Sequence, residues 1–287
     1  MNISLSILPE TNGMIIAVAF CPNPACLCGH TANELSTAMG TVIFSDVHAD
    51  ASAFSAFVSC IKKPSFADHF GTIDTVVNLG DILHRGNQPS ATLTHVHLLA
   101  QEFRLISVMG NHDHAFINRI PVSGSDAVST RRHDEVRGSP LLSLFTGMPM
   151  EWVCDTMLFV HGGPIELGSS TLRLKCWQRL GRDTGNSFAG YHYTPEMAFS
   201  ALRTKGLVHM CCGHQHSPLC CRNTPDGIKN YDLEFFEIKG AKNDPDALLV
   251  AQLPLDVPTI FRVGACSGKN PEFAFTDFTT FSFIRMA

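Results

Sequence analysis

The sequence predicts an α/β fold in which two facing β-sheets are flanked by helices. Apolar runs and helical patterns alternate over residues 41–109 in a β-α-β-α-β order, which implies parallel strands with right-handed crossovers. Residues 231–287 are instead strand-like throughout. The chain has 287 residues, 45% of them apolar, and no shift in composition divides it. We therefore expect one domain over residues 39–287.

The first elements alternate short buried strands with helices. Apolar runs predict strands at 41–45, 75–79 and 105–109. Apolar spacing predicts a helix at 51–61, and a second at 89–103 has Pro89 in its first turn.

The middle of the chain is less regular. Residues 123–138 are polar and carry three arginines, so we expect a surface loop there. Thr194, Pro195 and Glu196 have the residue types of an N-cap, a first helical position and an acidic first turn. That helix should end at Gly206. The other elements expected are a short helix at 141–145 and strands at 151–155, 157–160, 207–212, 235–238, 247–253, 259–263 and 279–286.

Composition excludes some classes of protein. Charged residues are 16% and the net charge is −5, which argues against a nucleic-acid carrier. A small ligand with concentrated negative charge stays compatible, because bound metal ions can supply a local positive field. No apolar run is long enough to span a bilayer, and the first 20 residues lack a basic start, so we expect a soluble, cytoplasmic protein.

Residues 1–38 read as an N-terminal extension. The segment 21–30 (CPNPACLCGH) contains three cysteines and a histidine, which fit either a small zinc site or incidental thiols in a poorly ordered extension. The 11 cysteines of the chain form no spaced framework, and the pairs 211–212 and 220–221 are adjacent. We expect these thiols to be reduced and buried.

Five polar clusters carry the candidate chemistry, and most directly follow an apolar strand. Because ligands in open α/β sheets collect at the carboxyl ends of strands, we expect the clusters to converge on one crevice. Imidazoles and carboxylates favour zinc, iron or manganese, and a bridging carboxylate holds two ions roughly 3.5–4 Å apart. The clusters are Asp46-Val47-His48, Gly80-Asp81, Gly110-Asn111-His112-Asp113, His161-Gly162-Gly163 and Gly213-His214-Gln215-His216.

These motifs, D-x-H, G-D-x-x-x-R-G, G-N-H-D, H-G-G and G-H-x-H in this order, resemble the calcineurin-like metallophosphoesterase family over residues 41–287. The resemblance implies a four-layer αββα sandwich of two mixed β-sheets flanked by helices. It also implies two divalent metal ions, with Mn²⁺ the first expectation and Fe, Zn, Co or Ni as alternatives. A hydroxide bridging the ions would attack phosphorus.

The resemblance also assigns roles to residues. His112, Arg85 and Asp113 are the catalytic candidates, and His112 would protonate the leaving oxygen or stabilise its charge. Arg85, Asn111, His112 and Arg179 are the substrate-binding candidates. The first ion would be held by Asp46, His48, Asp81 and His216, and the second by Asp81, Asn111, His161 and His214.

Within the family, residues 80–86 and 159–163 resemble the serine/threonine protein phosphatase branch and its dinucleoside-tetraphosphatase relatives. Trp177-Gln178-Arg179 resembles a W-x-R segment of that branch, in which Arg85 and Arg179 would grip phosphate. His84 departs from the pattern, because it stands where the branch has an aspartate that orients the catalytic histidine. We expect His84 to lie near His112 as a weaker partner.

Other departures are Asp113 for a glutamate, Met109 for an arginine, and His216, which completes a G-H-x-H that protein phosphatases generally lack. These departures bear on the substrate and not on the metal site. Three functions stay open: hydrolysis of phosphomonoesters, including phosphoproteins; hydrolysis of phosphodiesters or dinucleoside polyphosphates; and a non-catalytic scaffold of the same fold. The scaffold is disfavoured because all seven ligand residues and His112 are present. Substrate choice would lie in residues 114–140 and 164–193.

Overall fold

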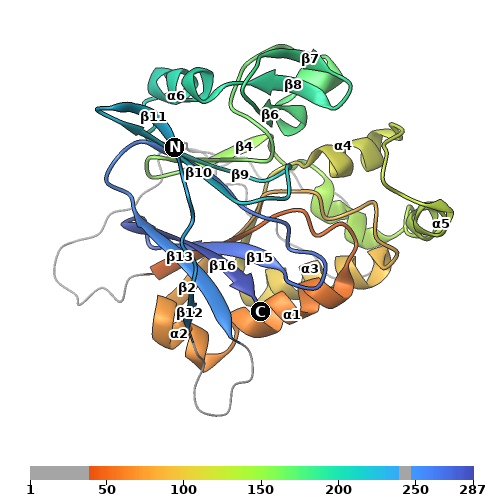
Figure 1. Ribbon diagram of the computed structural model, residues 1–287. Helices are drawn as coiled ribbons and strands as arrows, with labels where there is room; N and C mark the ends of the chain where they lie inside the picture. Colours follow the sequence, from red (N-terminus) through yellow and green to blue (C-terminus); the bar gives the residue numbers. More distant parts are fainter. Residues whose placement is uncertain (1–38, 239–246) are drawn as a thin grey trace, which may run out of the picture. The chain divides into compact units, whose positions relative to one another are not determined.

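Two β-sheets pack face to face and carry helices on their outer faces, as Figure 1 shows. The computed structural model describes residues 39–238 and 247–287. Within these residues the αββα order of layers confirms the expected α/β sandwich. The predicted boundary at residue 39 stays a prediction, and the candidate zinc site at 21–30 lies outside the described residues.

The larger sheet has the strand order β12-β13-β16-β15-β1-β2-β3. β1, β2 and β3 are parallel, as the crossover pattern predicted, whereas the later strands are antiparallel to their neighbours. Its strands are β1 (Met39–Phe44), β2 (Thr72–Asn78), β3 (Arg104–Ser107), β12 (Phe236–Ile238), β13 (Leu248–Pro254), β15 (Glu272–Thr276) and β16 (Thr280–Met286).

The second sheet has the order β11-β10-β14-β9-β5-β4, with β5, β9 and β14 parallel. Its strands are β4 (Glu151–Cys154), β5 (Met157–Val160), β9 (His209–Cys212), β10 (Leu219–Thr224), β11 (Gly227–Tyr231) and β14 (Thr259–Arg262). A small third sheet has the order β6-β8-β7 and comprises β6 (Arg179–Leu180), β7 (Gly185–Ser187) and β8 (Gly190–Tyr193).

Local signals set the helix ends. The Asp50 carboxylate accepts a hydrogen bond from Ala53 N–H at the start of α1, and the Thr194 hydroxyl accepts from Met197 N–H at the start of α6. The helices are α1 (Ala51–Ile61), α2 (Pro64–Phe70), α3 (Pro89–Glu102), α4 (Asn111–Asn118), α5 (Ala127–Glu135) and α6 (Pro195–Thr204), with 3-10 turns η1 (Pro140–Phe145), η2 (Thr171–Arg173) and η3 (Lys175–Trp177).

The core is divided into layers by the two sheets. Phe54 and Phe57 of α1 pack with other apolar residues of α1–α3 against the outer face of the larger sheet. Phe159 and Phe283 belong to the cluster between the sheets. Phe199 of α6 packs on the outer face of the second sheet. Alternate residues of a strand therefore point into two different cores. Both faces of such a strand are buried, which explains why its sequence is a continuous apolar run.

One predicted loop was wrong. Residues 123–138 contain α5, which begins after Asp126, whose carboxylate accepts a hydrogen bond from Ser129 N–H. Only Ser129 and His133 of this helix are buried, so it has no apolar stripe for a sequence pattern to detect. The cysteine pairs 211–212 and 220–221 are buried thiols, as expected. Among the described residues no helix is long and apolar enough to span a membrane.

Candidate metal centre

The five polar clusters follow the carboxyl ends of five strands. β1, β2 and β3 supply the first three clusters, and β5 and β9 of the other sheet supply the remaining two. β1–β3 are adjacent in their sheet, as are β5 and β9 in theirs. The predicted convergence on one place is thus observed, and both sheets contribute to it.

The loops that carry the clusters have strained backbones. Eleven non-glycine residues of 39–238 and 247–287 have a positive φ, and eight of them lie in the loops after β1, β2 and β9. Each left-handed residue costs about 1 kcal/mol, and such strain typically marks functional sites. The eight are Asp46, His48, Ala49, Asp81, His84, Arg85, His214 and His216.

Hydrogen bonds and close packing hold these loops together. The Asp46 and His48 N–H groups donate to the Gly80 and Asp81 carbonyls at 3.0 and 2.9 Å. A Cβ at Gly110 would lie 2.1 Å from the Asp81 backbone nitrogen, so this approach requires glycine. The buried Asp113 carboxylate accepts the N–H groups of residues 81, 82 and 83 at 2.7–3.1 Å. Asp113 therefore faces the loop backbone.

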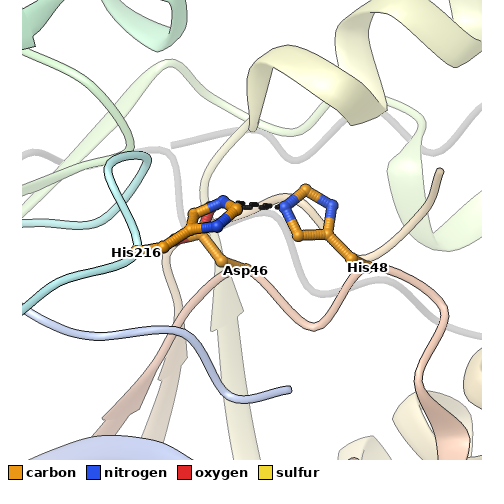
Figure 2. A group of neighbouring side chains, drawn as sticks. All are labelled: Asp46, His48 and His216. Atoms are coloured by element: carbon orange, nitrogen blue, oxygen red, sulfur yellow. Dashed lines mark hydrogen bonds and ion pairs between the residues drawn. The ribbon is translucent and has the colours of Figure 1, made fainter. Parts of the chain in front are cut away.

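A first group of side chains joins the loops after β1 and β9. Figure 2 shows Asp46, His48 and His216 turned toward one another. The two histidine Nε2 atoms are 3.0 Å apart, and His216 Nε2 is 3.2 Å from Asp46 Oδ1. His48 Nε2 also lies 3.9 Å from Asp81 Oδ2, which connects this group to the next.

A second group surrounds His161 Nε2. Its neighbours are Asn111 Oδ1 at 3.1 Å, His214 Nδ1 at 3.2 Å and Asp81 Oδ2 at 3.3 Å. The buried Asp81 side chain thus belongs to both groups. Its other oxygen, Oδ1, accepts the His112 N–H at 2.8 Å.

The donor chemistry of both groups fits metal ions. The Nδ1 atoms of His48 and His161 face the Leu83 and Leu79 carbonyls, which can only accept, so each Nδ1 donates its proton there. In the neutral imidazole each Nε2 therefore presents a lone pair. Buried acceptors therefore face one another. In addition, Asp46 Oδ1 and Asp81 Oδ2 are buried with no hydrogen-bond partner. A cation is the partner that satisfies such a set.

The pKa values follow the same charge pattern. Burial alone would raise the pKa of Asp46 and Asp81, but neighbouring histidines hold both well below the usual range. Burial alone would lower the pKa of His161, yet the carboxylate of Asp81 raises it to about 9. Two buried, ionised carboxylates that lie close together are stable only with positive charge beside them.

His112 lies next to both groups and against Arg85. The Arg85 Nη2 donates to His112 Nε2 at 3.3 Å. The His84 ring is 5.5 Å from that of His112, so it lies near, as expected, and burial lowers the pKa of His84 to about 3. Burial, with the Arg85 charge, lowers the pKa of His112 below its usual value despite Asp81. His112 with His48 and Asp81 forms a further trio of possible ligands.

Arg179 lies on the same side of the site as Arg85. Both line one pocket with Asn111 and His112. Arg179 is half-buried, and its Nε donates to the Ala189 carbonyl at 3.0 Å. The structure thus brings all the predicted site residues into one region.

Two further residues hold the loop after β2 that carries His84 and Arg85, called here the arginine loop, and were missed by the sequence analysis. The Arg85 N–H donates to Ser125 Oγ at 2.9 Å, and the His84 N–H donates to His133 Nε2 at 2.7 Å. His133 Nδ1 in turn donates to the Ser129 carbonyl at 2.8 Å. Neither residue belongs to a motif, and both lie in the segment expected to be a loop.

Comparison with known proteins agrees with this geometry. The calcineurin-like phosphoesterase family matches residues 39–218, and the chain belongs to this family of metallophosphoesterases. No curated protein is significantly similar in sequence.

Solved structures share the fold at low identity. A metallophosphoesterase from Sphaerobacter thermophilus has a TM-score of 0.57 and 22% identity, covering 86% of this chain and 88% of the other. A hypothetical protein from Pyrococcus horikoshii OT3 has a TM-score of 0.54 and 11% identity, covering 85% and 86%. These likenesses establish the fold, in agreement with the predicted sandwich.

Proposed function

We propose that this protein hydrolyses phosphomonoesters with two divalent metal ions. The observation that carries the proposal is the pair of acceptor-rich groups that share Asp81. The first ion would be held by Asp46, His48, Asp81 and His216, and the second by Asp81, Asn111, His161 and His214. Manganese is the metal of choice for a first assay.

The bound ions would supply Lewis-acid charge for phosphate oxygens and would activate water. The remaining roles belong to this chain's own side chains. His112, in its protonated form, would give a proton to the leaving oxygen, because it lines the same pocket as Arg85. Asp113 acts as a positioning residue, since its carboxylate fixes the loop that carries Asp81.

The two arginines favour a monoester over a diester. A terminal phosphate offers several free oxygens, and a guanidinium fork binds two of them with parallel hydrogen bonds. Arg85 and Arg179 line one pocket beside His112, so both border the same volume. Phosphodiesters and dinucleoside polyphosphates form the second candidate class.

The test uses the purified protein loaded with manganese. Elemental analysis should find about two ions per chain. Turnover should be higher on the two phosphomonoesters of the panel, a small phosphomonoester and a phosphopeptide, than on a phosphodiester and a dinucleoside tetraphosphate. A folded, metal-loaded protein with no turnover on any of the four would support the scaffold reading and reject the proposal.

Arg85→Ala separates the ester classes. The variant should lose about 10-fold or more in kcat/KM on monoesters and less on diesters, because a diester offers the fork fewer free oxygens. Arg137→Ala is the matched control, since Arg137 lies on the surface and donates to the Phe116 carbonyl. Equal losses on both ester classes would mean that Arg85 has no part in choosing between them.

A further inference from the structure

An apolar pocket of about 360 Å³ opens beside Arg85 and His112. This volume is within the range of about 300–1,000 Å³ typical of small-molecule sites. Its walls come from the segment after α4, from η2 and η3, and from the tip of the β7–β8 hairpin. The apolar lining residues are Ile120, Pro121, Val122, Leu172, Trp177 and Phe188.

Phe188 is the most unusual member of this lining. Its side chain sits at the hairpin tip and is 94% exposed. The next residue, Ala189, accepts the hydrogen bond from Arg179 Nε, so an arginine of the pocket holds the hairpin in place. A large exposed aromatic side chain beside a site gains by covering a second ring.

A second pocket, of about 470 Å³, also has Arg85 in its lining. It is polar, and Asp50, Gln88 and Asp126 are among its lining residues. Arg85 lines both pockets, whereas His112 lines the apolar one and not the polar one. The two pockets therefore differ in both polarity and access to the proton donor.

From this asymmetry we propose that the substrate is a phosphomonoester of an apolar aromatic alcohol, whose ring occupies the apolar pocket. The inference rests on the proposed function. In the hydrolysis a water oxygen bonds to phosphorus and loses a proton to solvent, the ester P–O bond breaks, and the leaving oxygen takes the proton of His112, which solvent then replaces. The organic group must then lie on the His112 side, where the walls are apolar. Polar alcohols would gain little from these walls.

The test compares two esters whose leaving alcohols have similar acidity, benzyl phosphate and 2-hydroxyethyl phosphate. The unmodified protein should have the higher kcat/KM on benzyl phosphate. Phe188→Ala should lower that value about 10-fold, and Leu172→Ser about 5-fold, with changes under about 2-fold on 2-hydroxyethyl phosphate. The controls are Phe236→Ala and Leu98→Ser, because these residues are also exposed and do not line the pocket.

Calorimetry gives a readout that needs no turnover. Benzylphosphonate should bind the metal-loaded protein about 10-fold more tightly than methylphosphonate, and Phe188→Ala should remove the difference. Hydrolysis of both esters with equal kcat/KM, unchanged by Phe188→Ala, would overturn the pocket inference and leave the phosphoesterase intact. If neither ester is hydrolysed, the proposed function fails, and the phosphonate comparison alone decides whether the pocket binds rings.

Discussion

The two carboxylate oxygens of Asp81 make different contacts. Oδ1 accepts the backbone N–H of His112, which starts α4, and Oδ2 faces His161 and His48. One carboxylate thus fixes the residue proposed as proton donor and also belongs to both proposed ion sites. No other side chain of the two groups combines these tasks.

Replacing this carboxylate should therefore be the most damaging single change. Asp81→Asn keeps the size and the acceptor for His112 N–H but removes the charge that would offset repulsion between two dications. We expect loss of the metal pair and at least a 10³-fold drop in kcat, on the order expected for a lost catalytic ion. Elemental analysis and steady-state kinetics measure both. Two bound ions with near-normal turnover would refute the bridging assignment.

At the scale of elements, α5 is a support for the arginine loop. Its residue His133 and the preceding Ser125 accept the N–H groups of His84 and Arg85, which both have left-handed backbones. Burial lowers the pKa of His133, which keeps Nε2 as an acceptor at neutral pH. The helix and the residue before it thus hold the backbone from which the Arg85 side chain extends.

Removing the His133 acceptor should misplace Arg85. His133→Phe leaves the His84 N–H unsatisfied, at about 1–3 kcal/mol. We expect about a 10-fold lower kcat/KM on a phosphomonoester with unchanged metal content, and recovery in His133→Gln, which restores an acceptor. The decisive measurement is a double-mutant cycle with Arg85→Ala. If the His133→Phe loss persists in full in the Arg85→Ala background, the helix does not act through the arginine.

A second link between elements lies on the surface. The Glu151 carboxylate at the start of β4 is 2.5 Å from Lys205 Nζ, after α6, and 2.8 Å from Lys175 Nζ, in η3. Burial alone would raise the pKa of Glu151, but the two ammonium groups lower it below its usual value. The ion pairs join three segments far apart in sequence.

The contribution of these ion pairs to the free energy of unfolding should depend on pH. Because the folded-state pKa is lowered, the stabilisation is fully present above the unfolded value of about 4.5 and is lost as pH falls through the folded value. Glu151→Gln should cost about 0.5–1 kcal/mol at pH 7 and less near pH 4. Urea denaturation at both pH values tests this. A cost that is equal at both would show that the charge is unimportant.

The sequence predicted those elements and side chains whose signals are local. Short apolar runs located β1, β2 and β5, and glycine-flanked clusters located the residues that the loops bring together. α5 could not be found in this way, because it is polar and is fixed by contacts to a distant loop. β6–β8 were missed for a similar reason: they are short and carry no apolar alternation. The apolar pocket, assembled from three separated segments, exists only in the folded chain.

On the scale of the whole molecule, the candidate metal centre joins the two sheets. Asp46, Asp81 and Asn111 come from loops of the larger sheet, whereas His161 and His214 come from the other. Ions bound by both sets would stabilise the packing of one sheet on the other. Without ions, the repulsion between two buried carboxylates would lower the stability of the fold.

Manganese should therefore raise the melting temperature. Binding at 100 times Kd contributes about 2.7 kcal/mol per site, which for a domain of this size is on the order of 5–10 °C. Differential scanning fluorimetry with manganese and with a chelator measures the shift. Asp81→Asn should abolish it, and Arg85→Ala should retain it. A melting temperature that manganese leaves unchanged would contradict metal coupling between the sheets.

The neighbours of β1 in the larger sheet have a consequence for biosynthesis. β1 pairs with β2 on one side and on the other with β15, which is translated long after β1 itself. A nascent chain halted before Glu272 would already contain every proposed metal ligand, yet β1 would keep an unpaired apolar edge. Such edges are templates for aggregation. The chain should therefore depend on chaperones until translation passes β15, and its capacity to bind metal should mature late, long after the ligands themselves have been made.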